Sequence, residues 1–183
     1  MNWLLFLPQL PASPSTLRVT IWRRMRAAGA FGLQNNVWML PATSENKQFI
    51  ESQMAYIKEQ GATSYTFEVT TLNSAIEETI LAGFRSQSDE EYTEFCERCD
   101  VLLAELERET TDEKFTFAEL EETETDLHKL ETWLAKITGR DFVKGSLKER
   151  ASEKLEQCQQ AYKAFASNVY AQHGINPPDV TEE

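Results

Sequence analysis

The spacing of apolar residues changes along this chain, and the change restricts the folds open to it. In the first 71 residues, short apolar or alternating runs typical of strands are separated by stretches with the 3.6-residue period of a helix. From residue 88 onward only the helical period persists. The predicted order is strand, helix, strand, helix, strand, helix and then three long helices, which indicates an α+β protein.

Three segments are predicted to be strands. Residues 3–7 form a continuous apolar run that ends at Pro8, and residues 33–40 are apolar on both faces. Residues 63–71 alternate between apolar and polar side chains, with Tyr65 and Phe67 on the apolar face. We therefore expect the first strand to be buried and the third to be half-buried.

Helices are predicted between these strands. Ser15 is expected to cap a helix that runs to Ala28, and Gly29 is expected to end it. Residues 43–60 follow the helical period up to Gly61. Four pairs of Ser or Thr with Glu three residues later are typical of helix starts, at Ser74, Ser88, Thr116 and Ser146.

The change of pattern also predicts the domain organisation. Residues 1–87 are expected to form a small α/β module, and residues 88–174 a helical region packed on it. A single core that continues across residue 87 is an open alternative. Residues 175–183 are expected to be a flexible tail.

Charge is unevenly distributed along the chain. The 183 residues carry 18 basic and 30 acidic side chains, a net charge of −12, yet no acidic residue precedes Glu45. A polyanionic partner is therefore expected to meet the N-terminal third. All the basic residues before Glu45 lie in one predicted helix: Arg18, Arg23, Arg24 and Arg26.

Helical geometry predicts where these arginines point. Arg23 and Arg26 are expected to face outward, whereas Arg18 and Arg24 border the apolar face and Trp22 lies at its edge. Guanidinium groups match phosphate oxygens, and Trp22 could stack on Arg18 or on a base. Two alternatives remain open: the arginines form a solvated face, or they pair with carboxylates of this same chain.

Cys96 and Cys99 lie three residues apart in a predicted helix, on one side of it. Such a pair can be a redox centre or half of a zinc site. No second pair of this spacing occurs, and the two histidines lie far apart in the sequence. Because Cys99 also fits the apolar stripe, core packing is the favoured prediction.

The sequence contains no motif that predicts catalysis. It lacks a P-loop, a G-x-G-x-x-G motif and an H-E-x-x-H motif, so no enzyme, metal or cofactor is expected. No apolar run approaches the length of a membrane span, and residues 3–7 are too short for a signal sequence. A soluble, cytoplasmic protein is expected.

Several segments resemble a known family. WLLFL followed by PSTLRVTIWRRMRAAGAFGLQNNVWMLP resembles the beginning of the chromate-resistance regulator ChrB. FRSQSDEEYTEFCERC and KFTFAELEETETDLHKLETWLAKITGRDF resemble later parts of the same N-terminal region. The likeness runs from about Trp3 to about Tyr170.

The resemblance implies a bacterial, cytoplasmic regulator that responds to chromate and binds the promoter of a chromate-transporter operon. The first part also resembles the ferredoxin-like module of the phenylacetate-operon (PaaX-like) regulators and the Cas2 nucleases. Those nucleases hold a metal with an acidic residue near the end of the first strand, where this chain has Pro8 and Gln9. Nuclease activity is therefore not expected. Full-length relatives carry a further C-terminal domain, so a stand-alone N-terminal domain is expected here.

The leading hypothesis is a non-enzymatic DNA-binding regulator with chromate as candidate effector. Arg18, Arg23, Arg24 and Arg26 would contact phosphates, and Trp22 would support their helix. A homodimer is expected because an exposed sheet edge can be completed by a partner strand. The alternatives are a protein-interaction or dimerisation module that uses the acidic helices, and a thiol redox protein that uses Cys96 and Cys99.

Overall fold

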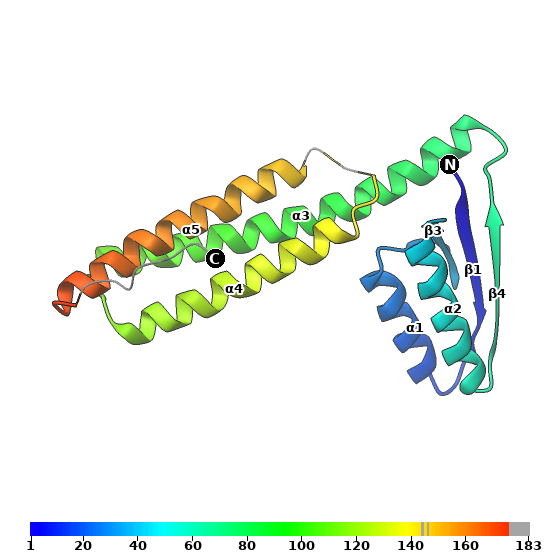
Figure 1. Ribbon diagram of the computed structural model, residues 1–183, viewed down its shortest axis with the longest axis horizontal. Helices are drawn as coiled ribbons and strands as arrows, with labels where there is room; N and C mark the ends of the chain where they lie inside the picture. Colours follow the sequence, from blue (N-terminus) through cyan, green and yellow to red (C-terminus); the bar gives the residue numbers. More distant parts are fainter. Residues whose placement is uncertain (144, 146, 176–183) are drawn as a thin grey trace. The chain divides into compact units, whose positions relative to one another are not determined.

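The computed structural model describes residues 1–143, 145 and 147–175. Within these residues, the chain forms a four-stranded antiparallel sheet with helices, followed by long helices, and this confirms the predicted α+β class (Figure 1). The chain divides into two compact units. Unit 1 comprises Met1–Gln87 and a short second segment that begins at Arg140. Unit 2 comprises Ser88–Gly139 and the chain from Gly145 onward.

Unit 1 has the ferredoxin-like order of elements, β-α-β-β-α-β. Its sheet has the strand order β2-β3-β1-β4, and all three pairings are antiparallel. The elements are β1 (Trp3–Gln9), α1 (Thr16–Ala27), β2 (Phe31–Gln34), β3 (Val37–Pro41), α2 (Ser44–Glu59) and β4 (Thr63–Val69).

The two faces of this sheet have different coverings. Leu4 and Phe6 of β1 pack in one core cluster with residues of α1 and α2, which lie on the same side of the sheet (Figure 1). Trp3, on the opposite face, packs with Ile80 and Phe84 from the beginning of helix α3 (Ser74–Thr111). Side chains alternate between faces along a strand, so β1 carries both cores.

The predicted strand over residues 33–40 is wrong in its extent. Residues 31–41 instead form the two strands β2 and β3, which pair with each other from Phe31 and Met39 to Gln34 and Val37. Asn36 between them has φ of 61°. Asparagine tolerates this left-handed conformation, so the Asn-Asn step makes a hairpin turn inside an otherwise apolar run.

The ends of α1 and α2 agree with most of the predicted signals. Gly29 and Gly61 have φ of 73° and 74°, as expected after a helix C-terminus. The side chain of Thr43 caps α2 by accepting a hydrogen bond from the backbone of Asn46 at 3.2 Å. Ser15 was expected to cap α1 in the same way, but its side chain makes no capping hydrogen bond.

Helix α3 corrects a second prediction, because it is one helix of 38 residues rather than two helices with a start at Ser88. Its first turn is capped by Asn73, whose side chain accepts from the backbone of Ile76 at 3.0 Å, rather than by Ser74. Nothing between Phe84 and Ser88 is a strong helix breaker. The helix therefore passes through the polar segment without interruption.

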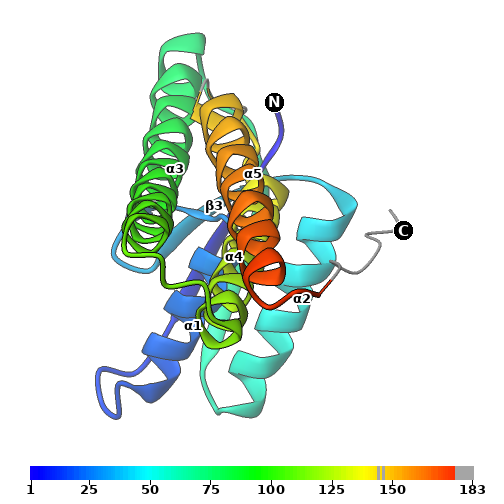
Figure 2. The same cartoon turned by 90° about the vertical axis from the view of Figure 1, so that its left-hand side faces the viewer.

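Unit 2 is a three-helix bundle. It contains the remainder of α3, α4 (Phe117–Gly139) and α5 (Leu147–Gln172), which lie alongside one another (Figures 1 and 2). The side chain of Thr116 accepts from the backbone of Glu119 at 3.3 Å, which confirms that predicted cap. The predictions for Ser146 and for the tail beyond Ile175 lie outside the described residues.

The bundle core contains side chains from all three helices. Its fully buried members include Tyr92, Phe95 and Cys99 of α3, Ile137 of α4, and Cys158, Phe165 and Val169 of α5. Among the described residues, no helix is both long enough and apolar enough to cross a membrane.

Glu109 near the end of α3 gives this bundle a predicted pH dependence. Its side chain is only 4% exposed, and its Oε2 is buried without a hydrogen-bond partner within the described chain, while Arg108 Nη2 lies 3.8 Å from its Oε1. Burial and the neighbouring carboxylate of Glu119 raise the pKa of Glu109. The folded state therefore binds a proton more readily than the unfolded state, so this group's contribution to stability falls as pH rises above the ordinary Glu pKa.

Replacing Glu109 with Gln is expected to stabilise the fold at neutral pH by about 1 kcal/mol. The neutral amide avoids burial of a charge and can donate to Glu119. The gain should shrink at acidic pH, where the wild-type carboxyl is already protonated. Urea unfolding of both proteins at the two pH values measures this; an equal gap at both pH values would contradict the pKa assignment.

Candidate nucleic-acid interface on helix α1

Helix α1 presents one side to the core of unit 1 and the other to solvent. Ile21 is 1% exposed and Met25 is fully buried, and both belong to the core cluster that contains Leu4 and Phe6 of the sheet. Because successive helical residues are rotated by about 100°, the side opposite Ile21 and Met25 must face outward. The predicted site residues are distributed between these two sides.

Arg24 is held against helix α2. Its guanidinium carbon lies 4.1 Å from the centre of the Tyr56 ring, and its Nη1 donates a hydrogen bond to Gln53 Oε1 at 3.2 Å. Gln53 is itself only 6% exposed. The half-buried position of Arg24 agrees with the prediction that it borders the apolar face.

Arg18 and Arg26 are also half-buried and hydrogen-bonded. Arg18 Nη2 donates to the carbonyl of Pro11 at 3.0 Å, and Arg26 Nη1 donates to Gln87 Oε1 at 2.5 Å. Arg26 was expected to face outward, away from the apolar side of α1, and it is half-buried because Gln87 covers it. The first part of α3, which carries Gln87, lies within reach of Arg26, and the sequence period of α1 contains no sign of that neighbour.

Trp22 and Arg23 occupy the solvent side of α1. Trp22 is 53% exposed and Val19, one turn earlier, is 41% exposed. Arg23 is exposed and makes no hydrogen bond or ion pair with another described residue. Trp22 was expected at the edge of the apolar face, and about half of its side chain is exposed there to solvent.

The partners of the α1 arginines are neutral. Arg18, Arg24 and Arg26 donate to a backbone carbonyl or to a side-chain amide oxygen. Among the described residues, the ion pairs involve other basic groups, and none joins an α1 arginine to a carboxylate. The alternative in which these arginines pair with acidic groups of the same chain is thus not supported, and their charge remains available to an anion.

These neutral partners orient the arginines without cancelling their charge. Gln53 and Tyr56 lie on α2, 29 or more residues from Arg24 in the sequence, and Gln87 lies 61 residues from Arg26. Sequence reasoning missed all three, because no local pattern links a glutamine or tyrosine to an arginine at such separations. The result is a helix whose cationic groups are partly fixed in place.

The end of β1 differs from a metal site. Pro8 and Gln9 pair with Ser64 and Thr63 of β4, and neither can supply a carboxylate. No cluster of three or more His, Cys, Asp or Glu side chains suited to a metal ion occurs within the described part of the chain.

The cysteines lie in the bundle core. Cys96 is 6% exposed, Cys99 is fully buried, and the Cys158 thiol donates to the carbonyl of Cys99 at 3.6 Å. Burial raises the pKa of the Cys96 thiol, and a separate side-chain hydrogen bond with the Cys158 thiol, together with burial, raises the pKa of the Cys99 thiol. A reactive thiol needs access and a low pKa. The core-packing prediction is confirmed, and the thiol redox alternative is not supported.

The fold and the α1 surface together define a ferredoxin-like α/β module that displays a cationic helix and is joined to a helical bundle. A family model described as the N-terminal part of protein ChrB matches residues 18–175, which include most of α1 and the whole bundle. The chain therefore belongs to the ChrB N-terminal family. A search of curated proteins found no match.

Proposed function

We propose that this chain is a DNA-binding regulator of chromate resistance and that α1 is its main DNA contact. The observation that carries the proposal is the set of α1 arginines whose described partners are all neutral. Membership of the ChrB family supports the biological setting. The strongly acidic remainder of the chain would turn this helix, rather than another surface, toward a polyanion.

Each site residue has a role that follows from its position. Arg23, which is exposed and has no partner within the described part of the chain, contacts a phosphate directly. Arg18, Arg24 and Arg26 are pre-oriented by neutral acceptors, which lowers the entropy lost when they bind a phosphate. Trp22 adds an exposed side chain on the solvent side of α1, available to pack against sugars or bases.

In this proposal, the protein is a non-enzymatic, cytoplasmic regulator that needs no cofactor. Its effector is chromate. It acts as a homodimer, since a dimer would place two copies of α1 on one duplex. Small regulators usually recognise an operator as dimers, with one DNA-contacting helix of each copy at each half-site.

A mobility-shift assay tests the proposal. The intact protein is mixed with DNA from the promoter of a chromate-transporter operon at ~50 mM salt, a condition that favours phosphate contacts. A retarded band that weakens with added salt and changes with chromate is expected. Absence of any retarded band would contradict the proposal and favour the alternative in which the acidic helices bind another protein.

A further inference from the structure

Strand β4 is an unprotected edge of the sheet. Its seven residues pair regularly with β1, from Thr63 and Gln9 to Val69 and Trp3, and its other side has no strand partner among the described residues. The opposite edge, β2, is only four residues long and has an irregular register. Natural sheets usually shield a long edge with charged side chains, proline or a bulge. β4 has no proline and a regular register, and its one charged residue, Glu68, is bound by Lys47 and Asn2 of the same copy.

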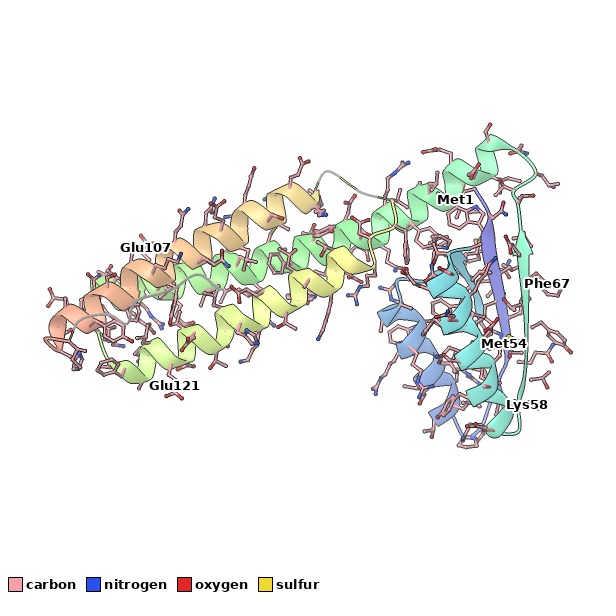
Figure 3. All side chains as sticks on the ribbon, in the orientation of Figure 1. Met1, Met54, Lys58, Phe67, Glu107 and Glu121 are labelled. Carbon is pink, nitrogen blue, oxygen red and sulfur yellow. The ribbon has the colours of Figure 1, made fainter. Side chains whose placement is uncertain are left out.

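The exposed aromatic residues of β4 are placed symmetrically about its centre. Thr66 is the middle residue, with Tyr65 before it and Phe67 after it. Tyr65 is 48% exposed and Phe67 is 53% exposed. They pair with Leu7 and Leu5 of β1, so they share the face opposite α1 and α2. Figure 3 shows Phe67 on the other side of the sheet from Met54 of α2.

We infer that a second copy of this chain docks on β4, with the two β4 strands antiparallel and the two-fold axis at Thr66. This register pairs all seven residues of each strand. It places Tyr65 directly opposite Phe67 of the second copy, and Phe67 opposite the second Tyr65. Cross-strand aromatic pairs stabilise such ladders, and the same patch serves both copies, as a two-fold interface requires.

The β4 side chains on the face that α1 and α2 cover are also compatible with this register. Thr66 lies on the axis opposite its counterpart, so the proposed register places no charged side chain at the centre of the interface. The Glu68 carboxylate is bound within its own copy by Lys47 at 2.8 Å and Asn2 at 2.9 Å. The two copies therefore do not bring uncompensated charge to the edge.

This inference rests on the proposed homodimer and specifies its interface. Cysteine cross-linking of the intact chain tests it. In Thr66→Cys the two introduced thiols face each other across the axis at about 5 Å between Cα atoms, within the range that a disulfide spans. In the control, Ser64→Cys, the two Cα atoms lie about 14 Å apart, which is too far for a disulfide. The native cysteines are buried and give little background.

Under mild oxidation, we expect Thr66→Cys to form a covalent dimer and Ser64→Cys to form roughly tenfold less. Light scattering of the wild type separates the two ways of failing. A dimer without a Thr66→Cys cross-link would overturn the β4 interface and leave the homodimer standing. A monomer at ~100 µM would overturn both, at a concentration where a specific interface of micromolar affinity is populated.

A second pair of variants covers the case in which Thr66→Cys fails to fold. In the proposed register, the double substitution Tyr65→Lys with Phe67→Glu places opposite charges across the axis, so the dimer should persist. Tyr65→Lys with Phe67→Lys places like charges there and should weaken association by about tenfold or more. Equal association of the two double variants would contradict the register, and circular dichroism verifies that both remain folded.

Discussion

The double substitution Arg23→Glu and Arg26→Glu is expected to weaken DNA binding by roughly a hundredfold at ~50 mM salt. Each phosphate contact contributes about 0.9 to the slope of log affinity against log salt, so losing two should flatten that slope by about 2. Arg23 has no partner to lose within the described chain, and Arg26 loses only one hydrogen bond, to Gln87. The fold should survive, and fluorescence anisotropy with a labelled duplex measures both effects.

The matched control changes the net charge equally but elsewhere. Lys148→Glu with Lys163→Glu reverses two exposed charges on α5 of unit 2. This control should retain a salt slope close to that of the wild type, with a smaller loss of affinity from the added negative charge. An equal loss of slope in both double variants would mean that net charge, rather than α1, governs binding.

The largest expected effect on stability is that of Phe84→Ala. Phe84 is 3% exposed and packs against three aromatic rings of unit 1. It stacks on Trp3 at 5.5 Å between ring centres, with Phe31 at 5.4 Å and the edge of Phe142 at 6.2 Å. Removing the ring leaves a cavity between α3 and the sheet, which costs about 3–5 kcal/mol in a well-packed core.

Urea unfolding of wild type and variant measures this loss. Leu72→Ala is the control, because Leu72 is 94% exposed and its truncation should change the free energy of unfolding by less than about 0.5 kcal/mol. A loss below about 1 kcal/mol for Phe84→Ala would show that the first part of α3 does not close the second face of the sheet.

The sequence predicts the architecture well where one local pattern decides it. The apolar run from Trp3 and the alternation at Tyr65 and Phe67 each correspond to a strand of the sheet. The glycines at positions 29 and 61 mark helix ends because the left-handed conformation favours glycine. The ferredoxin-like order required the resemblance as well, since periodicity did not separate β2 from β3.

The sequence predicts less where two patterns compete. A capping-box pair at Ser88 and Glu91 indicated a new helix, yet the helical period already extended through it, and α3 is continuous. A cap stabilises a helix end by about 1 kcal/mol, which does not offset the hydrogen bonds lost by breaking the helix there. A capping pair therefore marks a helix boundary only where the chain also changes direction.

The site was predicted as a set of residues but not as a geometry. Arg23 is exposed and Arg24 borders the core, as helical spacing indicated. The burial of Arg26 and the exposure of Trp22 were not predicted. Arg26 is covered by Gln87 of α3, and the exposure of Trp22 depends on how completely the core residues of α1 fill the space beneath the helix. Neither the position of α3 nor the packing beneath α1 can be predicted from the periodicity of a single helix.

The most direct test of the central claim is the salt dependence of DNA binding by the intact chain. Affinity for a duplex is measured by anisotropy from ~50 to ~200 mM salt, a range over which phosphate contacts weaken strongly. We predict a linear fall of log affinity with log salt whose slope is reduced by about 2 in the Arg23→Glu, Arg26→Glu variant. No measurable binding at ~50 mM salt, or a slope that the substitutions leave unchanged, would contradict the assignment of α1 as the DNA-binding helix.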